Sequence, residues 1–319
     1  MNVFLTFDVE IWCGGWERLD ERFPAAFERY VYGRSAAGDY ALPKTLEILA
    51  RHGLHGIFFV EPLFAARFGV EYLQRICALI VAAGQEIQLH LHPEWTDEIR
   101  PPVFPARPYK RQHLIEYDRD EQHALIVRGR TLLEAAAGTT VTAFRAGSFA
   151  ANADTLAALH TAGIGIDASI NVTAALSGRA LEQRARLTVP QRRGALCLVP
   201  MSVFRDGFGR LRHAQIGACA WPELRAALLD AERLGYSAFT VLAHNFELLR
   251  SGSSQPDFWV VQRFERLCAF LSAQRARLPT GSLTAPPGCD PLATHPEIPR
   301  VGSGATLLRY YEQARRRLG

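Results

Sequence analysis

The sequence predicts an α/β fold in which short buried strands run parallel and alternate with helices. Short apolar runs rich in Val, Ile and Phe recur along the chain, and segments with the 3.6-residue periodicity of amphipathic helices separate them. Three such runs and two helices fit within the first 95 residues, which is the βαβ rhythm of a parallel sheet or barrel. Most runs end in a charged or imidazole side chain, at the strand end where ligands bind in such folds.

Seven strands are expected, and the first of them, residues 2–8, is an apolar run that leads into Asp8 and Glu10. The other strands are expected at residues 56–61, 86–95, 140–145, 163–167, 195–200 and 238–244. Helices are expected at residues 42–52, 70–83, 118–137, 153–162, 221–234 and 258–276. The connection 11–40 is rich in aromatic residues, which either line a substrate groove or serve as packing. Residues 172–194 are expected to be irregular.

The chain is expected to form one barrel-like domain over residues 1–278. Residues 279–319 are expected to add a Pro/Gly-rich tether, 279–304, and a basic C-terminal helix, 305–318. Helical spacing of apolar residues predicts that this helix packs on the domain with its arginines in solvent. The apolar residues are Leu307, Leu308, Tyr311, Ala314 and Leu318.

Composition excludes several classes of protein. The 319 residues are 48% hydrophobic and 21% charged, as in a globular protein, and the net charge of +4 includes no dense basic stripe of the kind that binds nucleic acid. The longest apolar segment, residues 76–83, is too short to cross a bilayer. The six cysteines show no paired spacing, which argues against a zinc cluster. We expect a cytoplasmic protein with reduced thiols and no signal peptide before the first strand.

The strand ends suggest a metal site. Side chains alternate along a strand, so Asp8 and Glu10 can share a face, and His90 and His92, separated by Leu91, can do the same. Two imidazoles and a carboxylate suit a catalytic zinc that keeps one position for water. The alternatives are acids that shape a turn and histidines on the surface. Further strand ends carry Arg145, Asp167 and His244.

These residues give the chain a resemblance to the polysaccharide deacetylase (NodB-homology) superfamily of metal-dependent carbohydrate esterases. The resemblance extends from residue 2 to about residue 276 and includes counterparts of the five ordered motifs of that superfamily. The counterparts are Thr6-Phe7-Asp8-Val9-Glu10, the region around His90, Phe144-Arg145-Ala146-Gly147, Asp167-Ala168-Ser169 and Leu242-Ala243-His244-Asn245-Phe246. The spaced Asp-Val-acid form resembles a divergent branch, because the acids are usually adjacent. The resemblance implies a distorted (β/α)7 barrel of the polysaccharide deacetylase type.

The resemblance also implies roles for individual residues. Asp8 would be the catalytic base and Glu10 a metal ligand, with His90 and His92 as the other ligands and Glu94 as the alternative to His92. The usual histidine spacing is i, i+4, whereas the spacing here is i, i+2. Arg145 would orient the base, and His244 would be the general acid. Asp167 would orient His244 and keep it protonated, although a structural ion pair or helix cap is the alternative for both Asp167 and Arg145.

The expected function is metal-dependent hydrolysis of an N-acetyl group on an amino sugar or saccharide precursor, with zinc as the expected ion. The same fold and ligands would also suit allantoinase-like or deformylase-like cleavage of another C–N bond in a small molecule. A catalytically silent carbohydrate-binding barrel is the third possibility, and such a module should carry no stoichiometric metal.

Overall fold

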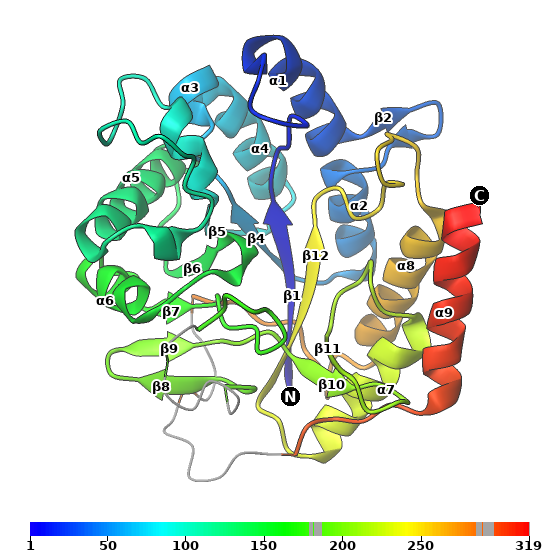
Figure 1. The fold of residues 1–319 in the computed structure, drawn as a ribbon. Coiled ribbons are helices and arrows are strands. Elements are labelled where there is room, and N and C mark those ends of the chain that lie inside the picture. The colour runs from blue at the N-terminus through cyan, green and yellow to red at the C-terminus, as the bar shows by residue number, and fades with distance from the viewer. Residues whose placement is uncertain (179–180, 182–186, 285–288, 290–296, 319) are drawn as a thin grey trace. The chain divides into compact units, whose positions relative to one another are not determined.

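The computed structural model describes residues 1–178, 181, 187–284, 289 and 297–318 (Figure 1). The chain divides into two compact units. Unit 1 comprises Met1–Gly56, Ser202–Gly281 and Pro296–Gly319, and unit 2 comprises Ile57–Met201 and Ser282–His295. All seven predicted strands form, and the pairings among them within each unit are parallel, which confirms the α/β class.

Unit 1 contains two neighbouring parallel strands from opposite ends of the sequence, β1 (Asn2–Val9) and β12 (Ala238–His244). Residues 3–9 of β1 are all buried, as expected of a run of apolar and β-branched residues. The register pairs Asn2 with Ala238 at one end and Asp8 with His244 at the other. Strand pairing therefore brings together two residues that lie 236 positions apart in the sequence.

Helices α2 (Leu42–His52), α7 (Trp221–Arg233) and α8 (Phe258–Ala273) pack within unit 1, α8 against both of the others. Helix α2 has a proline in its first turn and ends at Gly53, whose φ of 60° is a conformation that glycine adopts without strain. The carboxylate of Asp257 caps α8 by accepting hydrogen bonds from the backbone N–H groups of Trp259 and Val260. Unit 1 also contains the hairpin of β10 (Val203–Arg205) and β11 (Leu211–His213).

The aromatic connection 11–40 is more regular than a loop. It contains α1 (Leu19–Phe27), the π-helical turn η1 (Glu28–Tyr32) and the short hairpin β2 (Arg34–Ser35) and β3 (Gly38–Asp39). The packing expected of its aromatic residues is confirmed in part, and the alternative of a substrate groove stays a prediction. Phe23 and Phe27 are fully buried, whereas Trp12 and Tyr30 line a pocket.

Unit 2 contains the parallel strands β4 (Gly56–Val60), β5 (Glu86–Leu91), β6 (Ala143–Ala146), β7 (Ile166–Asp167) and β9 (Leu196–Leu198), paired in that order. The register pairs His90 with Arg145, and Phe144 with Asp167. His90, Arg145 and Asp167 therefore lie at the carboxyl ends of three consecutive strands. Strand β8 (Gln191–Arg193) runs antiparallel to β9, within a stretch that was expected to be irregular.

The helices of unit 2 are α3 (Ala65–Phe68), α4 (Val70–Ala82), α5 (Arg119–Ala137) and α6 (Ala153–Thr161). Short 3₁₀ turns add η2 (Pro93–Glu98), η3 (Leu114–Glu116) and η4 (Gly147–Phe149). Asp118 caps α5 through the backbone N–H of Glu121, as its position predicts. Among the described ranges of both units, every helix is too short or too polar to cross a bilayer.

The expectation of reduced thiols needs a correction. Cys197 on β9 and Cys289 form a disulfide, with their Cα atoms 5.6 Å apart. Their sequence separation of 92 gave no signal, because disulfide pairing depends on proximity in the folded chain. The remaining cysteines, Cys13, Cys77, Cys219 and Cys268, are free thiols, and the last three are buried, as expected.

The C-terminal helix α9 (Ser303–Leu318) forms and packs within unit 1, but not through the apolar stripe. Leu307, Leu308 and Tyr311 are exposed, so the prediction of an apolar docking face with arginines in solvent was wrong. Arg309 is 2% exposed, bridges to Asp206 at 2.9 Å and Glu223 at 3.3 Å, and thereby fixes a polar face of the helix. Figure 1 shows α9 beside α8, to which the Arg263–Glu312 ion pair ties it at 2.6 Å.

The side chain of Leu318 lies outside the described part of the chain. The same holds for residues 285–288 and 290–296 of the predicted tether, and for residues 179–180 and 182–186 of the segment expected to be irregular. The predicted domain boundary at residue 278 stays a prediction.

Candidate active site

The carboxyl end of β1 in unit 1 holds two carboxylates and an imidazole. Asp8, Glu10 and His244 each offer one ligand atom, and these atoms lie within 4.8 Å of one another. Asp8 and Glu10 are both almost fully buried. The period-two argument for these acids predicted that they would share a face, and their proximity agrees with it.

Asn245 holds Glu10 in place just beyond the end of β1. The side-chain oxygen of Asn245 accepts from the backbone N–H of Glu10 at 3.0 Å, and its amide donates to the carbonyl of Glu10 at 3.2 Å. The Asn245 side chain thus continues the hydrogen-bonding pattern where the strand stops. The indole of Trp12 donates to Oε2 of Glu10 at 2.6 Å, which orients the carboxylate. Sequence reasoning placed Asn245 in a motif but gave it no role.

His244 forms an ion pair with Glu247. Nδ1 of His244 lies 2.8 Å from Oε2 of Glu247, which also accepts from the backbone N–H of His244 at 3.0 Å. Burial by itself lowers the pKa of His244, but the hydrogen bond and charge of Glu247, with the charges of Glu10 and Asp8, outweigh it and raise the pKa to about 9. Burial likewise raises the pKa of Glu247, and the pairing with His244 outweighs that effect and lowers it. The pair is therefore ionised near neutral pH.

The carboxylate hydrogen-bonded to Nδ1 of His244 is thus that of Glu247, whereas the sequence suggested Asp167. The pattern His-x-x-Glu directly after a strand was the available signal, since a turn brings residues i and i+3 together. Glu247 is fixed in turn by Gln215, whose amide donates to Oε1 at 3.0 Å, and Gln215 accepts from Nε2 of His213 at 2.9 Å. A half-buried chain of hydrogen bonds from His213 through Gln215 to Glu247 therefore supports the candidate general acid.

In unit 2, His90 lies on β5 and His92 directly follows the strand, with the centres of their rings 4.8 Å apart. Nδ1 of His90 lies 2.8 Å from the carbonyl oxygen of Arg145. A carbonyl only accepts hydrogen bonds, so Nδ1 carries the proton and Nε2 is the atom suited to bind a metal. Nδ1 of His92 lies 3.2 Å from Oε2 of Glu94, which assigns the same tautomer. Metal-binding histidines usually show this arrangement, in which the second ring nitrogen donates to a carbonyl or carboxylate.

The structure bears on the choice between His92 and Glu94. Glu94 contacts the ring of His92 as a hydrogen-bond acceptor, which is the position of a residue that supports a ligand. Gly147 gives further support to His92, because a Cβ atom at Gly147 would lie 2.7 Å from Cε1 of the His92 ring. Only glycine leaves room for the imidazole there. This geometry supports His92 as the ligand.

Arg145 and Asp167 lie fully buried at the ends of β6 and β7. The Nε of Arg145 donates to the carbonyl of Ala168 at 3.2 Å, and its guanidinium lies over the ring of Phe59, 4.2 Å from the centroid. Asp167 accepts from the hydroxyl of Ser169 at 2.6 Å. Burial raises the pKa of Asp167 to about 6, although the bonds from Ser169 and the charge of Arg145 oppose that shift. The hydrogen-bond partner of Asp167 is therefore Ser169. Orientation of Asp8 by Arg145 stays a prediction.

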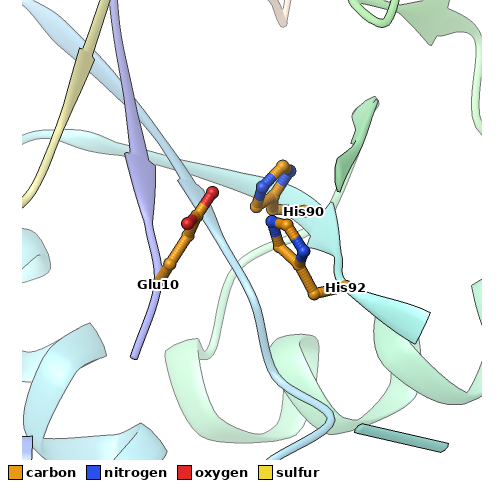
Figure 2. Close-up of side chains that lie close together, drawn as sticks. All are labelled: Glu10, His90 and His92. Carbon is orange, nitrogen blue, oxygen red and sulfur yellow. The ribbon is translucent and has the colours of Figure 1, made fainter. Parts of the chain in front are cut away.

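Glu10, His90 and His92 each offer a ligand atom, and these atoms lie within 4.8 Å of one another (Figure 2). The donor set of one carboxylate and two imidazoles fits a divalent metal, and the tautomers assigned to both histidines fit the same use. The residues present are therefore suited to hold one ion.

Comparison with known proteins bears on the fold. No protein-family profile matches the chain, and no curated protein matches it in sequence. A crystal structure from Mycobacterium smegmatis, of a protein provisionally described as a polysaccharide deacetylase, aligns with a TM-score of 0.53 and 20% identity over 89% of this chain and 94% of that one. The chain therefore has the α/β barrel fold of polysaccharide deacetylases, as the sequence resemblance predicted.

Two further structures are more distant. A family 4 carbohydrate esterase from Streptomyces lividans, in complex with acetate, has 14% identity and a TM-score of 0.45 over 94% of this chain and 98% of that one. A family 4 pseudoenzyme from Bacillus anthracis has 15% identity and the same TM-score over 94% and 69%. Likeness at this level carries no argument about activity.

Proposed function

We propose that the protein is a metal-dependent hydrolase that removes an acetyl group from the nitrogen of an amino sugar. Two groups of possible metal ligands among the described residues support the proposal: Glu10 with His90 and His92, and Asp8 with Glu10 and His244. The description of the Mycobacterium smegmatis protein supports a carbohydrate amide as the substrate class. Zinc is the proposed ion, because His₂-carboxylate sites suit it.

The chemistry divides between the ion and the protein side chains. When bound, the ion would supply Lewis-acid polarisation of the amide carbonyl and acidify a coordinated water. Asp8, beside Glu10, would accept the proton of the attacking water. His244, kept protonated by Glu247, would donate a proton to the leaving nitrogen, which an amide needs because a free amide anion is a very poor leaving group. The pairing of Asp8 with His244 supports these assignments, because it brings the two candidate proton-transfer groups to the same end of β1 and β12.

Acetate release from a panel of N-acetylated sugars, combined with bound-metal analysis, tests the proposal. We expect stoichiometric divalent metal and acetate release by the wild-type protein. Asp8→Asn should lose turnover while it keeps the metal, since Asp8 is assigned to proton transfer and Glu10 to the ion. Metal-free protein without acetate release would favour a silent binding barrel. Bound metal without activity on acetylated sugars would favour another C–N bond, as in allantoinase-like or deformylase-like hydrolysis.

An ester substrate separates the role of His244 from that of Asp8. An ester leaving group needs less protonation than an amine, so His244→Ala should reduce amide cleavage far more than cleavage of an acetyl ester. Equal losses on both substrates would contradict the assignment of His244 as the general acid and leave it a positioning group. A cytoplasmic location also stays a proposal, which the redox state of Cys197 and Cys289 in cells would test.

A further inference from the structure

Helix α9 turns its apolar side chains away from the body of unit 1. It packs beside α7 and α8 (Figure 1), and the side chains buried there are polar: Thr306, Arg309 and Glu312. The rest of its surface carries large apolar side chains that are well exposed: Leu307, Leu308, Tyr310 and Tyr311. An amphipathic helix of a globular protein normally has the reverse orientation. This orientation gives up hydrophobic stabilisation that contact with another apolar surface would restore.

Further exposed aromatic rings adjoin this surface. Phe208, in the turn between β10 and β11, is exposed and stacks on Tyr310 with 6.2 Å between the ring centroids. Near the end of α9, Arg315 lines one hollow together with Phe258 and Trp259 from the first turn of α8. In the described part of unit 1, every large apolar side chain that is well exposed lies in one of these three places. Exposed apolar side chains that gather in this way mark an interaction surface.

Among the described side chains of these elements, the exposed charges are positive. Arg210 lies in the same turn as Phe208, and Arg315 lies one helical turn after Tyr311, and both arginines are exposed. The carboxylates of α9, of the hairpin and of the cap of α8 are instead buried in ion pairs: Glu312 with Arg263, Asp206 with Arg309, and Asp257 with Arg316. They therefore present little negative charge to a partner.

The charge distinguishes a lipid surface from a second copy of the chain as the occupant. A two-fold contact between two copies presents the same patch from both sides, so Arg210 and Arg315 of both copies would approach one another with like charge. The phosphates of an anionic bilayer have the complementary charge. Tyrosine rings favour the boundary between lipid headgroups and acyl chains, and arginine side chains reach from that boundary to the phosphates. The charge and the aromatic composition therefore both favour lipid.

We propose that the exposed face of α9, with Phe208 beside it, is a docking site for the surface of an anionic phospholipid bilayer. Helix α9 lies in the plane of the membrane interface, with Leu307, Leu308 and Tyr311 against the upper part of the acyl chains. Arg210 and Arg315 pair with lipid phosphates. Docking of this kind needs no membrane-spanning helix, and it does not depend on the function proposed above.

Co-sedimentation of the full-length protein with lipid vesicles tests the inference. Vesicles of phosphatidylcholine alone are compared with vesicles of phosphatidylcholine mixed with phosphatidylglycerol, each at low and at high salt. We expect the protein to pellet with the anionic vesicles, to pellet less with the neutral ones, and to be released from the anionic vesicles as salt is raised. If the protein stays in solution with anionic vesicles, or pellets equally with both kinds, the inference is overturned.

Leu307→Gln and Tyr311→Gln locate the apolar contact. Both side chains are more than half exposed, at 57% and 54%, so these substitutions should leave the melting temperature unchanged. Each should weaken binding to the anionic vesicles about tenfold, because an apolar side chain is no longer transferred from water to lipid. The matched controls are Val81→Gln and Tyr109→Gln, which remove exposed apolar side chains from unit 2 and should leave vesicle binding unchanged. Binding by both α9 variants that equals wild-type binding would overturn the inference.

Arg210→Gln and Arg315→Gln test the contribution of charge. Each should weaken binding to anionic vesicles about fivefold and change binding to neutral vesicles little. The control is Arg107→Gln, which removes the same charge from an exposed position in unit 2 and should leave binding unchanged. Sedimentation velocity without lipid tests the alternative occupant. A wild-type dimer that Leu307→Gln dissociates would show that a second copy covers this face, and would overturn the inference.

Discussion

Glu247→Gln is the sharpest perturbation of the candidate acid. The substitution keeps the shape of the side chain and removes the charge that holds His244 protonated. The pKa of His244 is about 9 in the folded protein, against an ordinary value of 6.5. Without the carboxylate of Glu247, only the charges of Glu10 and Asp8 oppose the effect of burial, so the pKa of His244 should fall back toward 6.5. A shift of that size corresponds to roughly 3 kcal/mol of stabilisation of the imidazolium.

The expected consequence for activity follows from the protonated fraction. At pH 8, a histidine with a pKa near 9 is about 90% protonated, whereas one with a pKa of 6.5 is about 3% protonated. If His244 is the general acid, the alkaline limb of the pH–rate profile should move down by about 2 units in the Glu247→Gln variant. The proton NMR signal of the imidazole should titrate over the same range.

Stability should follow the same linkage. Because folding raises the pKa of His244, its protonation stabilises the fold fully below pH 6.5, and that contribution is lost as pH rises through about 9. The variant should lack this dependence, which thermal melts at pH 6 and pH 10 would show. Glu247→Asp, which keeps the charge, is the control and should retain most of the alkaline activity. An unchanged alkaline limb in Glu247→Gln would refute the reasoning.

Three further outcomes follow from the geometry. His92→Ala should abolish metal binding, whereas Glu94→Gln should weaken metal affinity by roughly 10–100-fold, as the loss of a supporting hydrogen bond does. Equilibrium dialysis measures both affinities. If His92→Ala keeps the metal and Glu94→Gln loses it, Glu94 rather than His92 is the ligand. Gly147→Ala should displace the His92 ring and lower metal affinity with a smaller effect on the melting temperature, and unchanged affinity would show that the ring has room. Arg309→Met should lower the free energy of unfolding by about 3–5 kcal/mol, because Asp206 would be left as a buried charge without its partner. Denaturation by urea measures the free energy of unfolding, and a decrease below about 1 kcal/mol would show that water reaches Asp206.

The local chemistry of the strand ends was predictable from the sequence. Seven apolar runs gave seven strands because each run must bury its side chains on both faces, and period-two alternation placed Asp8 with Glu10 and His90 with His92. These inferences depend only on residues that are close in the sequence. The choice of Glu10 rather than Asp8 as the carboxylate beside the two histidines required the resemblance to a known fold as well.

Contacts between distant segments, and choices between chemically similar partners, were beyond the sequence. The sequence analysis considered Asp167 alone as the acid beside His244, and the turn after β12 brings Glu247 to the imidazole instead. The docking face of α9 was misjudged, since its periodicity shows an apolar stripe but not that Arg309 has buried carboxylates to meet.

The sequence by itself therefore determined the strand pattern and the residues that carry the chemistry, because burial and alternation act along a few consecutive residues. The tertiary structure alone decided that Asp8 lies beside His244, through the pairing of the first strand with the last. It also decided that the carboxylate of Glu247 pairs with the imidazole of His244 and keeps it protonated, and that Cys197 forms a disulfide with Cys289. Strand pairing, turn geometry and burial set the distances between side chains. The strength of a charge or hydrogen bond depends on those distances rather than on separation along the chain.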